Sequence, residues 1–241
     1  MRKSCSDTSD CRLAVITARG GSKRIPRKNI KDFCGKPIIA YPIEAALESR
    51  LFDEVMVSTD DEEIATVARS HGAEVPFVRS AANSDDHSTT NDVVSEVLQS
   101  YEALGRRFDT ICCLYPTAPF VTADLLKAAF ETFGGTGFSS LIPVARYAFP
   151  PQRGMVVEGG QLKYKYPELA AARSQDLEPI YHDCGQFYIC DAGAFIRTGR
   201  LAAEPAMPFI MSDLEVHDID SPEDWMIAEQ KFEFLKRKAA K

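Results

Sequence analysis

The sequence predicts one α/β domain built on a mostly parallel sheet with helices on both faces. Short apolar runs alternate with segments of helical spacing, and the 45% hydrophobic and 26% charged residues are typical of a globular protein. A chain of 241 residues is long enough for one large core. No apolar run approaches the ~20 residues that span a bilayer, so we expect no membrane partner.

The first half of the chain repeats the order strand, helix, strand, which suits parallel βαβ units. A polar segment at 1–12 predicts a flexible tail, and the domain is expected to occupy 13–241. Apolar runs predict strands at 13–18, 54–59, 75–78 and 109–115, and helical spacing predicts helices at 37–49, 61–72, 91–104 and 122–133. In the fourth strand, Cys112 and Cys113 should point to opposite faces of the sheet.

The alternation stops after a strand expected at 138–145. Residues 146–181 are rich in proline and tyrosine, and Gly159 and Gly160 mark the turn of a hairpin. This segment therefore predicts an insertion that protrudes from the sheet. The elements expected after it are strands at 186–190 and 215–219 and a last helix that Ser221 caps, with Pro222 at its first position and Lys236, Arg237 and Lys238 at its end.

Cysteine usage and the N-terminus bear on the cellular compartment. The seven cysteines include no C-x-x-C pair, and no apolar stretch follows the two basic residues at the N-terminus. These features favour a reduced, cytoplasmic protein. A zinc site formed by His182, Cys184 and Cys190 is an alternative that no paired spacing supports.

Five basic residues and no acid lie between Arg19 and Lys28, in a chain whose formal net charge is −7. This basic loop follows the first strand, and ligands of open α/β sheets bind beyond the carboxyl ends of strands. Gly20 and Gly21 would let backbone N–H groups approach an anion, and the basic side chains supply charge. Because neither a P-loop nor a G-x-G-x-x-G pattern is present, we interpret the loop as a phosphate site of another kind. Positive charge confined to one loop argues against a nucleic-acid partner.

Two aspartates lie near the end of the chain, at the end of the strand expected at 215–219. On a strand, Asp218 and Asp220 would present both carboxylates on one face. Such a pair can hold one Mg²⁺ while phosphate oxygens fill other positions. Acid-x-acid pairs are common in so acidic a chain, so the alternative is two solvated acids. The metal site is favoured because a phosphate-binding loop at one strand end and a carboxylate pair at another would form one consistent site.

Four motifs carry a family resemblance: ARGGSKRIPRKN at 18–29, STDDEEIA at 58–65, YPTAPF at 115–120 and HDIDSPEDW at 217–225. In this order they resemble the CMP-sialic acid synthetases, cytidylyltransferases that activate nine-carbon keto-sugar acids. YPTAPF, FPPQR at 149–153, RSQDL at 173–177 and YHDCGQFY at 181–188 resemble the pseudaminic acid cytidylyltransferase branch. N-acetylneuraminate synthetases usually carry Gln where Tyr115 stands, and Arg and Asn where His182 and Cys184 stand.

The resemblance implies a glycosyltransferase-A-like (Rossmann-like) nucleotidyltransferase fold and a homodimer formed through a protruding element, for which 146–181 is the candidate. CTP and a keto-sugar acid would react to give the CMP-sugar and pyrophosphate. Carried over by position, Arg19, Ser22, Lys23 and Lys28 would bind the triphosphate, with Arg19 and Lys23 also catalytic; Asn29, Arg79 and Thr90 would bind the nucleoside; Asp218 and Asp220 would hold catalytic Mg²⁺. An aspartate or a metal-bound water would take the hydroxyl proton.

The prediction of the sugar-binding residues depends on polar residues in the motifs that resemble the pseudaminic acid cytidylyltransferase branch. The expected sugar-binding residues are Tyr115, Arg173, Gln175, His182, Gln186 and Tyr188. Arg173 could pair with the sugar carboxylate, across the dimer or within one chain, or simply with Asp176. Rival hypotheses are a synthetase for N-acetylneuraminate, legionaminate or the eight-carbon sugar Kdo, and a non-catalytic nucleotide-sensing module.

Overall fold

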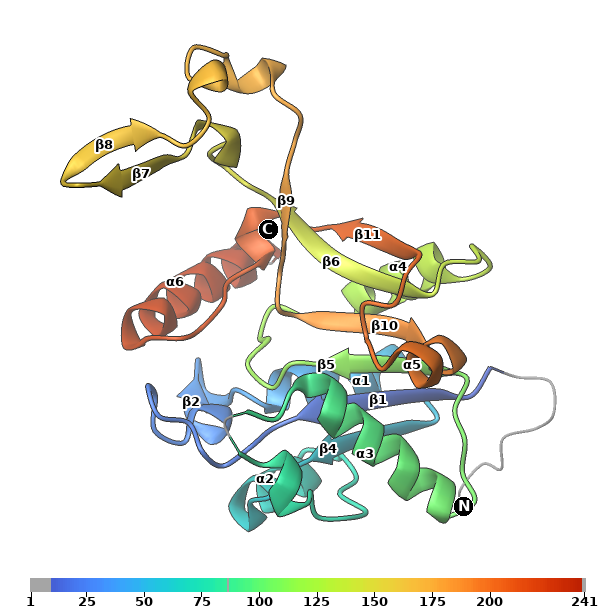
Figure 1. Cartoon of the computed structure of the whole chain (residues 1–241). Helices are drawn as coiled ribbons and strands as arrows, with labels where there is room; N and C mark the ends of the chain where they lie inside the picture. The colour runs from blue at the N-terminus through green and yellow to red at the C-terminus, as the bar shows by residue number, and fades with distance from the viewer. Residues whose placement is uncertain (1–9, 86, 240–241) are drawn as a thin grey trace.

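The computed structural model describes residues 10–85 and 87–239, so the tail expected at 1–12 lies almost entirely outside the described residues. One mixed sheet forms its centre (Figure 1). The strands, in spatial order, are β4 (Glu54–Ser58), β1 (Arg12–Thr17), β5 (Thr110–Leu114), β10 (Phe187–Asp191), β6 (Ser140–Arg146) and β11 (Ala206–Ile210). A further short strand, β9 (Tyr181–Asp183), pairs with β6.

The direction of the strands confirms the mostly parallel sheet. β1 pairs in parallel with β4 and β5, and β6 pairs in parallel with β11. β10 is antiparallel to both of its neighbours, β5 and β6. Five of these six strands therefore run the same way, and β10 is reversed among them.

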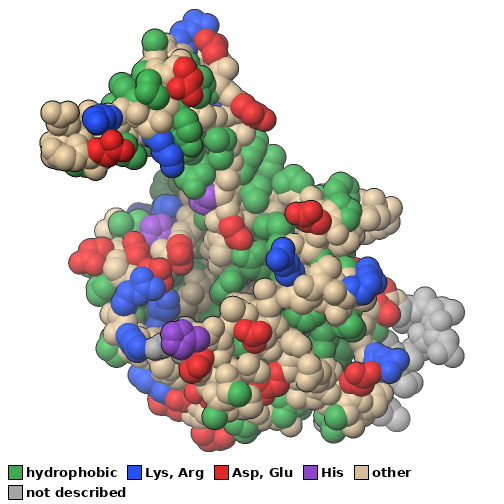
Figure 2. Space-filling model, in the orientation of Figure 1, with side chains coloured by type: hydrophobic (Ala, Val, Ile, Leu, Met, Phe, Trp, Pro, Cys, Tyr) green, Lys and Arg blue, Asp and Glu red, His purple; other side chains and the backbone are tan. Residues whose placement is uncertain are grey.

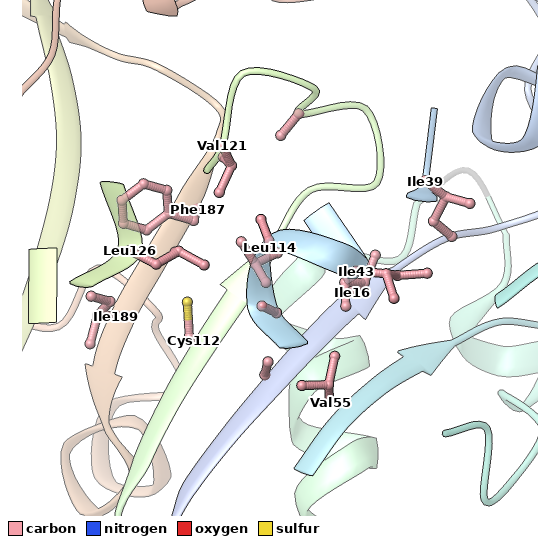
Figure 3. Close-up of a cluster of buried hydrophobic side chains, with 14 of the residues drawn as sticks. Ile16, Ile39, Ile43, Val55, Cys112, Leu114, Val121, Leu126, Phe187 and Ile189 are labelled. Carbon is pink, nitrogen blue, oxygen red and sulfur yellow. The ribbon is translucent and has the colours of Figure 1, made fainter. Parts of the chain in front are cut away.

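Helices cover both faces of the sheet and bury two separate apolar clusters. The helices are α1 (Ala40–Ser49), α2 (Glu62–Ser70), α3 (Thr90–Ala103), α4 (Ala123–Phe133), α5 (Ala192–Thr198) and α6 (Pro222–Ala239). Residues of α1, α2 and α4 pack with Cys112 on one face (Figure 3), and residues of α3 and α5 pack with Cys113 on the other. The two cysteines therefore point to opposite faces, as predicted.

Polar side chains cap the N-termini of α2, α3 and α6. The Asp61 carboxylate accepts hydrogen bonds from the first turn of α2, and Thr89 and Asp92 form a capping box at α3. At α6, the Ser221 hydroxyl accepts from the Asp224 N–H while the Asp224 carboxylate accepts from the Ser221 N–H. The helix expected after Ser221 is thus confirmed, with its cap.

Residues 147–180, between β6 and β9, leave the sheet and form a protruding segment above the body, which we call the arm (Figure 1). It contains the hairpin of β7 (Met155–Glu158) and β8 (Gln161–Tyr164), which turns at Gly159 and Gly160 as predicted. Both glycines have positive φ, +57° and +78°, a conformation that costs glycine little. The chain returns to the sheet through β9.

Two strand predictions are wrong. Residues 75–78 form no strand, because only Glu74 bridges to β4 and Pro76 has no N–H to donate. Residues 215–219 are also irregular, and the Val216 carbonyl accepts from Lys231 Nζ (3.0 Å) instead of from a neighbouring strand. The edge position beside β6 belongs to β11, which sequence reasoning missed together with α5 and β9.

The cysteines are mostly buried thiols. Cys112, Cys113, Cys184 and Cys190 are free and buried, and burial raises the pKa of Cys113, Cys184 and Cys190 to about 12. The structure places Cys11 in a disulfide, and the other described cysteines are free. Within residues 10–85 and 87–239, no helix is both long and apolar enough to cross a bilayer.

Candidate functional site

A cavity of about 490 Å³ opens where the loops after β1 and β5 meet the segment between α2 and α3, at the carboxyl edge of the sheet. Basic and acidic side chains are interleaved on this flank of the body, below the arm (Figure 2). Nine of the predicted site residues line the cavity: Arg19, Ser22, Lys23, Lys28, Asn29, Arg79, Thr90, Tyr115 and Asp220. The structure thus brings together residues that are up to 201 positions apart in the sequence.

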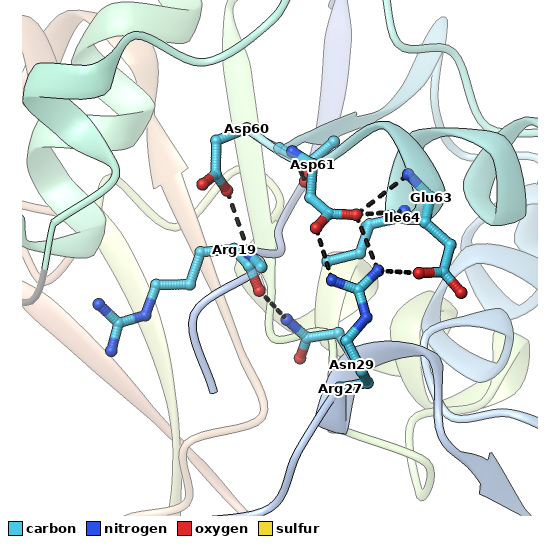
Figure 4. Close-up of polar contacts among 9 residues, drawn as sticks. Arg19, Arg27, Asn29, Asp60, Asp61, Glu63 and Ile64 are labelled. Carbon is cyan, nitrogen blue, oxygen red and sulfur yellow. Dashed lines mark hydrogen bonds and ion pairs between the residues drawn. The ribbon is translucent and has the colours of Figure 1, made fainter. Parts of the chain in front are cut away.

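The basic loop is held against the start of α2 (Figure 4). Arg27, in the left-handed region at φ 54°, donates to both Asp61 carboxylate oxygens at 2.5 and 2.9 Å and to Glu63 at 2.5 Å. The Arg27 guanidinium lowers the pKa of Asp61 to about 2, with help from the backbone N–H groups of α2. Arg27 therefore fixes the loop, and other basic residues of the loop face the cavity.

Gly20 has a different role from the one expected. Its N–H donates to the Asp60 carboxylate at 3.1 Å, so the protein itself occupies this donor. A Cβ at Gly20 would lie 2.7 Å from Asp61 Oδ2, which is closer than real Cβ atoms approach. Gly20 is thus required for the close packing of the loop on Asp61, which corrects the proposed approach of its N–H to an anion.

Arg79 is the buried cation of the cavity, only 6% exposed. Its guanidinium donates to the Ser58 hydroxyl (3.0 Å) and carbonyl, and among the described residues it forms no ion pair. Burial lowers its pKa, and Asp60 and Glu96 partly offset this effect. A buried guanidinium with hydrogen bonds but no paired carboxylate favours a ligand that offers oxygen acceptors.

Hydrogen bonds also join the basic loop to residues on opposite sides of the cavity. The Asn29 side chain is buried and donates to the Arg19 carbonyl at 2.9 Å. Arg19 donates to the Asp85 carbonyl at 2.8 Å. Lys28 Nζ donates to the Ile219 carbonyl at 2.7 Å, which ties the loop to the aspartate segment.

The two aspartates of the predicted metal site differ in their position relative to the cavity. Asp220 lines the cavity, pairs with Arg24 at 2.8 Å and lies 3.6 Å from Lys28, whereas Asp218 is exposed and does not line it. The two flank buried Ile219, but on irregular backbone and not on the strand that we predicted. Carboxylate oxygens suit Mg²⁺, which commonly binds one or two carboxylates together with substrate phosphates, so Asp220 fits that ion as the ligand inside the cavity.

The alternative zinc site would need three or more protein ligands. In the described part of the chain, no group of three or more His, Cys, Asp or Glu side chains is placed to hold a metal ion. The alternative zinc site is therefore wrong: His182 packs against the Tyr147 ring, and Cys184 and Cys190 are separately buried.

On the sugar side, three of the six predicted residues lie together and are called the wall below: Tyr115, Gln186 and Tyr188. Of these three, only Tyr115 lines the cavity, and its ring meets that of Tyr188 edge-on, with centroids 5.9 Å apart. The Tyr115 N–H donates to the Gln186 carbonyl at 3.0 Å. Gln186 is 1% exposed, and its Oε1 has no hydrogen-bond partner among the residues that the structure describes. Burial raises the pKa of Tyr115, which stays protonated.

The other three sugar residues do not reach the cavity of their own chain. Arg173 and Gln175 lie on the arm, and Arg173 pairs with Asp176 at 2.7 Å, which is the local alternative left open above. His182, on β9, contacts the Asp183 carbonyl (2.9 Å). Of the six predicted residues, Tyr115, Gln186 and Tyr188 therefore lie at the cavity or in contact with its lining within one chain.

Sequence reasoning missed part of the cavity wall. Arg24, Asn83, Asp85 and Ser88 also line it. Asp85 accepts from the N–H and hydroxyl of Ser88, an Asx turn that the sequence D-x-x-S indicates. That turn signal says nothing about a ligand, so these residues could not be assigned.

Comparison with known proteins gives related sequences and folds. A family model described as cytidylyltransferase matches residues 13–145. The chain is 41% identical over 213 residues to pseudaminic acid cytidylyltransferase of Campylobacter jejuni, covering 88% of this chain and 92% of that protein. It is 37% identical over 230 residues to CMP-N,N'-diacetyllegionaminic acid synthase of Legionella pneumophila, covering 92% and 96%.

A solved structure shares the fold. CMP:2-keto-3-deoxy-manno-octonic acid synthetase, in complex with CTP, superposes with a TM-score of 0.66 at 18% identity, over 94% of this chain and 99% of that one. At this identity the likeness concerns the fold alone. It confirms the expected nucleotidyltransferase-type α/β fold.

Proposed function

The chain belongs to the cytidylyltransferase family, and we propose that it transfers CMP from CTP to the anomeric hydroxyl of a nine-carbon keto-sugar acid. The sugar acid that we propose is pseudaminic acid. One observation carries the proposal. A single cavity joins the basic loop, the buried guanidinium of Arg79 and the carboxylate of Asp220. That set suits a nucleoside triphosphate with its metal ion.

In the proposed reaction, the anomeric hydroxyl attacks the α-phosphorus in line with the bond to the β-phosphate. A sugar–phosphate ester forms, the bond from the α-phosphorus to the oxygen that bridges to the β-phosphorus breaks, and pyrophosphate leaves. The hydroxyl proton passes to a base, an aspartate or water. Such transfers depend mainly on positioning and on charge stabilisation. Arg19 and Lys23 would stabilise the charge that develops on pyrophosphate, while Asn29, Arg79 and Thr90 hold the nucleoside.

Asp218 and Asp220 would hold Mg²⁺. When bound, the ion supplies charge compensation for the phosphates. Arg24 and Lys28 neutralise the Asp220 carboxylate in the protein alone. Both basic side chains also line the cavity, where they would be available to phosphate oxygens of the nucleotide.

The sugar assignment follows the relatives of this chain. Identity is 41% to a pseudaminic acid enzyme and 37% to a legionaminic acid enzyme. The wall of Tyr115 and Tyr188 would receive the sugar, because it lies on the opposite side of β5 from the basic loop.

The test is pyrophosphate release with CTP, Mg²⁺ and a panel of pseudaminate, legionaminate, N-acetylneuraminate and Kdo. We expect the highest kcat/KM with pseudaminate. Preference for another acid would refute the sugar assignment. CTP binding without turnover on any acid would support a nucleotide-sensing module.

We further propose a homodimer formed through the arm. The arm exposes large apolar side chains, with Phe149, Val157 and Leu162 exposed by 88%, 72% and 66%. Exposed apolar surface of this kind is typical of an interface. Arg173 and Gln175 lie away from the cavity of their own chain, so a partner's cavity would be their place of action.

A further inference from the structure

Asp183 is an exposed residue that contacts Tyr188, and it was not among the predicted site residues. It is the last residue of β9, where the arm rejoins the sheet, and it pairs with Val144 of β6. The next N–H, of Cys184, donates to the Pro143 carbonyl at 3.1 Å. Backbone pairing therefore holds Asp183 in place on both sides.

The Asp183 carboxylate makes two contacts that converge on the turn before β10. Oδ1 accepts from the Gly185 N–H at 2.8 Å, and Oδ2 accepts from the Tyr188 hydroxyl. Gly185 has φ +58°, which glycine tolerates best. One carboxylate thus links the turn to the aromatic ring that follows it.

Tyr188 transmits this contact to the cavity. It lies on β10 opposite Cys113 of β5, half-buried, and its ring packs edge-on against Tyr115. Burial and the bond to Asp183 raise the pKa of Tyr188, so its hydroxyl remains a donor to the carboxylate. A hydrogen bond to a charged acceptor is stronger and more directional than a neutral one.

We propose that Asp183 is a positioning residue that sets the orientation of Tyr188, and through it of Tyr115, for the acceptor sugar acid. This inference rests on the proposed function. Tyr115 follows β5, and residues 183–186 precede β10, whereas the basic loop follows β1 on the other side of β5. Asp183 and Tyr188 do not themselves line the cavity of the proposed CTP residues, so loss of Asp183 should affect use of the acceptor more than use of CTP.

The experiment compares Asp183→Ala, Tyr188→Phe and the double variant. We expect each single variant to raise the KM for the sugar acid about tenfold, with the KM for CTP changed less than about twofold. Because Asp183 acts through Tyr188, the double variant should be no worse than the poorer single one. Asp183→Asn, which keeps a hydrogen-bonding group, should restore part of the loss. Glu131→Gln, an exposed acid on α4, is the matched control and should match the wild type in both KM values.

Additive effects in the double variant, or an equal rise in both KM values, would overturn the inference. Wild type that turns over no keto-sugar acid would instead refute the proposed function. A crystal structure of Asp183→Ala decides the positioning role even then. We expect the Tyr188 ring to leave its place against Tyr115, and unchanged rings would overturn the inference.

Discussion

The clamp between Arg27 and Asp61 holds the basic loop, and Asp61→Asn removes its charge without removing the helix cap. Asp61 Oδ1 accepts from the Glu63 and Ile64 N–H groups, each at 3.0 Å. Asparagine caps helices about as well as aspartate, so this contact is retained. What is lost is the carboxylate opposite the Arg27 guanidinium.

The magnitude follows from the pKa of Asp61, which falls from 3.8 to about 2. A shift of this size corresponds to roughly 2.5 kcal/mol of folding free energy at neutral pH. Arg27 is 38% exposed, so water screens the pair, and we expect a loss of about 1–2 kcal/mol. Because the folded pKa is lowered, the contribution is complete above pH 4 and disappears as pH falls towards 2.

The assay is urea unfolding of wild type and Asp61→Asn at pH 7 and pH 3. The difference in unfolding free energy should shrink to roughly half at pH 3. Asp191→Asn is the matched control, since Asp191 caps α5 without an ion pair among the described residues, and it should change stability by less than about 0.5 kcal/mol. A pH-independent difference, or none at pH 7, would refute the clamp.

Three further predictions address the cavity and the arm. Arg79→Met should raise the KM for CTP at least about tenfold, because the cation that faces the cavity is lost. The free energy of unfolding should change by less than about 1 kcal/mol, because an apolar side chain of similar length replaces the buried charge; an unchanged KM would remove Arg79 from the site. Asp220→Ala should lower Mg²⁺-dependent pyrophosphate release at least about 100-fold while equilibrium dialysis still detects CTP binding; normal turnover would contradict the metal assignment. Val157→Glu should convert a dimer into a monomer in sedimentation velocity, because an interface would bury an unpaired charge, and an intact dimer would place the interface elsewhere.

The place of the basic loop at the cavity was predictable because its charges cluster in the sequence. Arg19, Lys23 and Lys28 lie in one loop after a strand, and the topology of α/β sheets places such loops at the carboxyl edge. Ser22 and Asn29 of the same loop were named from the family resemblance and not from local chemistry. The last helix was predictable from its cap.

The misses have physical causes. Pro208 conceals β11, and its position at the edge of the sheet is what allows proline there. Residues 215–219 form no strand, and lysine side chains take the place of a strand partner at two of their carbonyls: Val216 accepts from Lys231 and Ile219 from Lys28. Asp183 could not be found either, since its role depends on a fold that brings Tyr188 against Tyr115.

The reversal of β10 has a consequence for how acceptor choice could be re-engineered. A parallel strand would present its end at the ligand edge, but β10 presents its beginning, so the arm and the wall behind Tyr115 belong to one continuous stretch, 146–188. The basic loop, Arg79 and Asp220 lie outside that stretch. Transplanting it between relatives as one cassette should exchange the sugar that is accepted and leave the use of CTP intact.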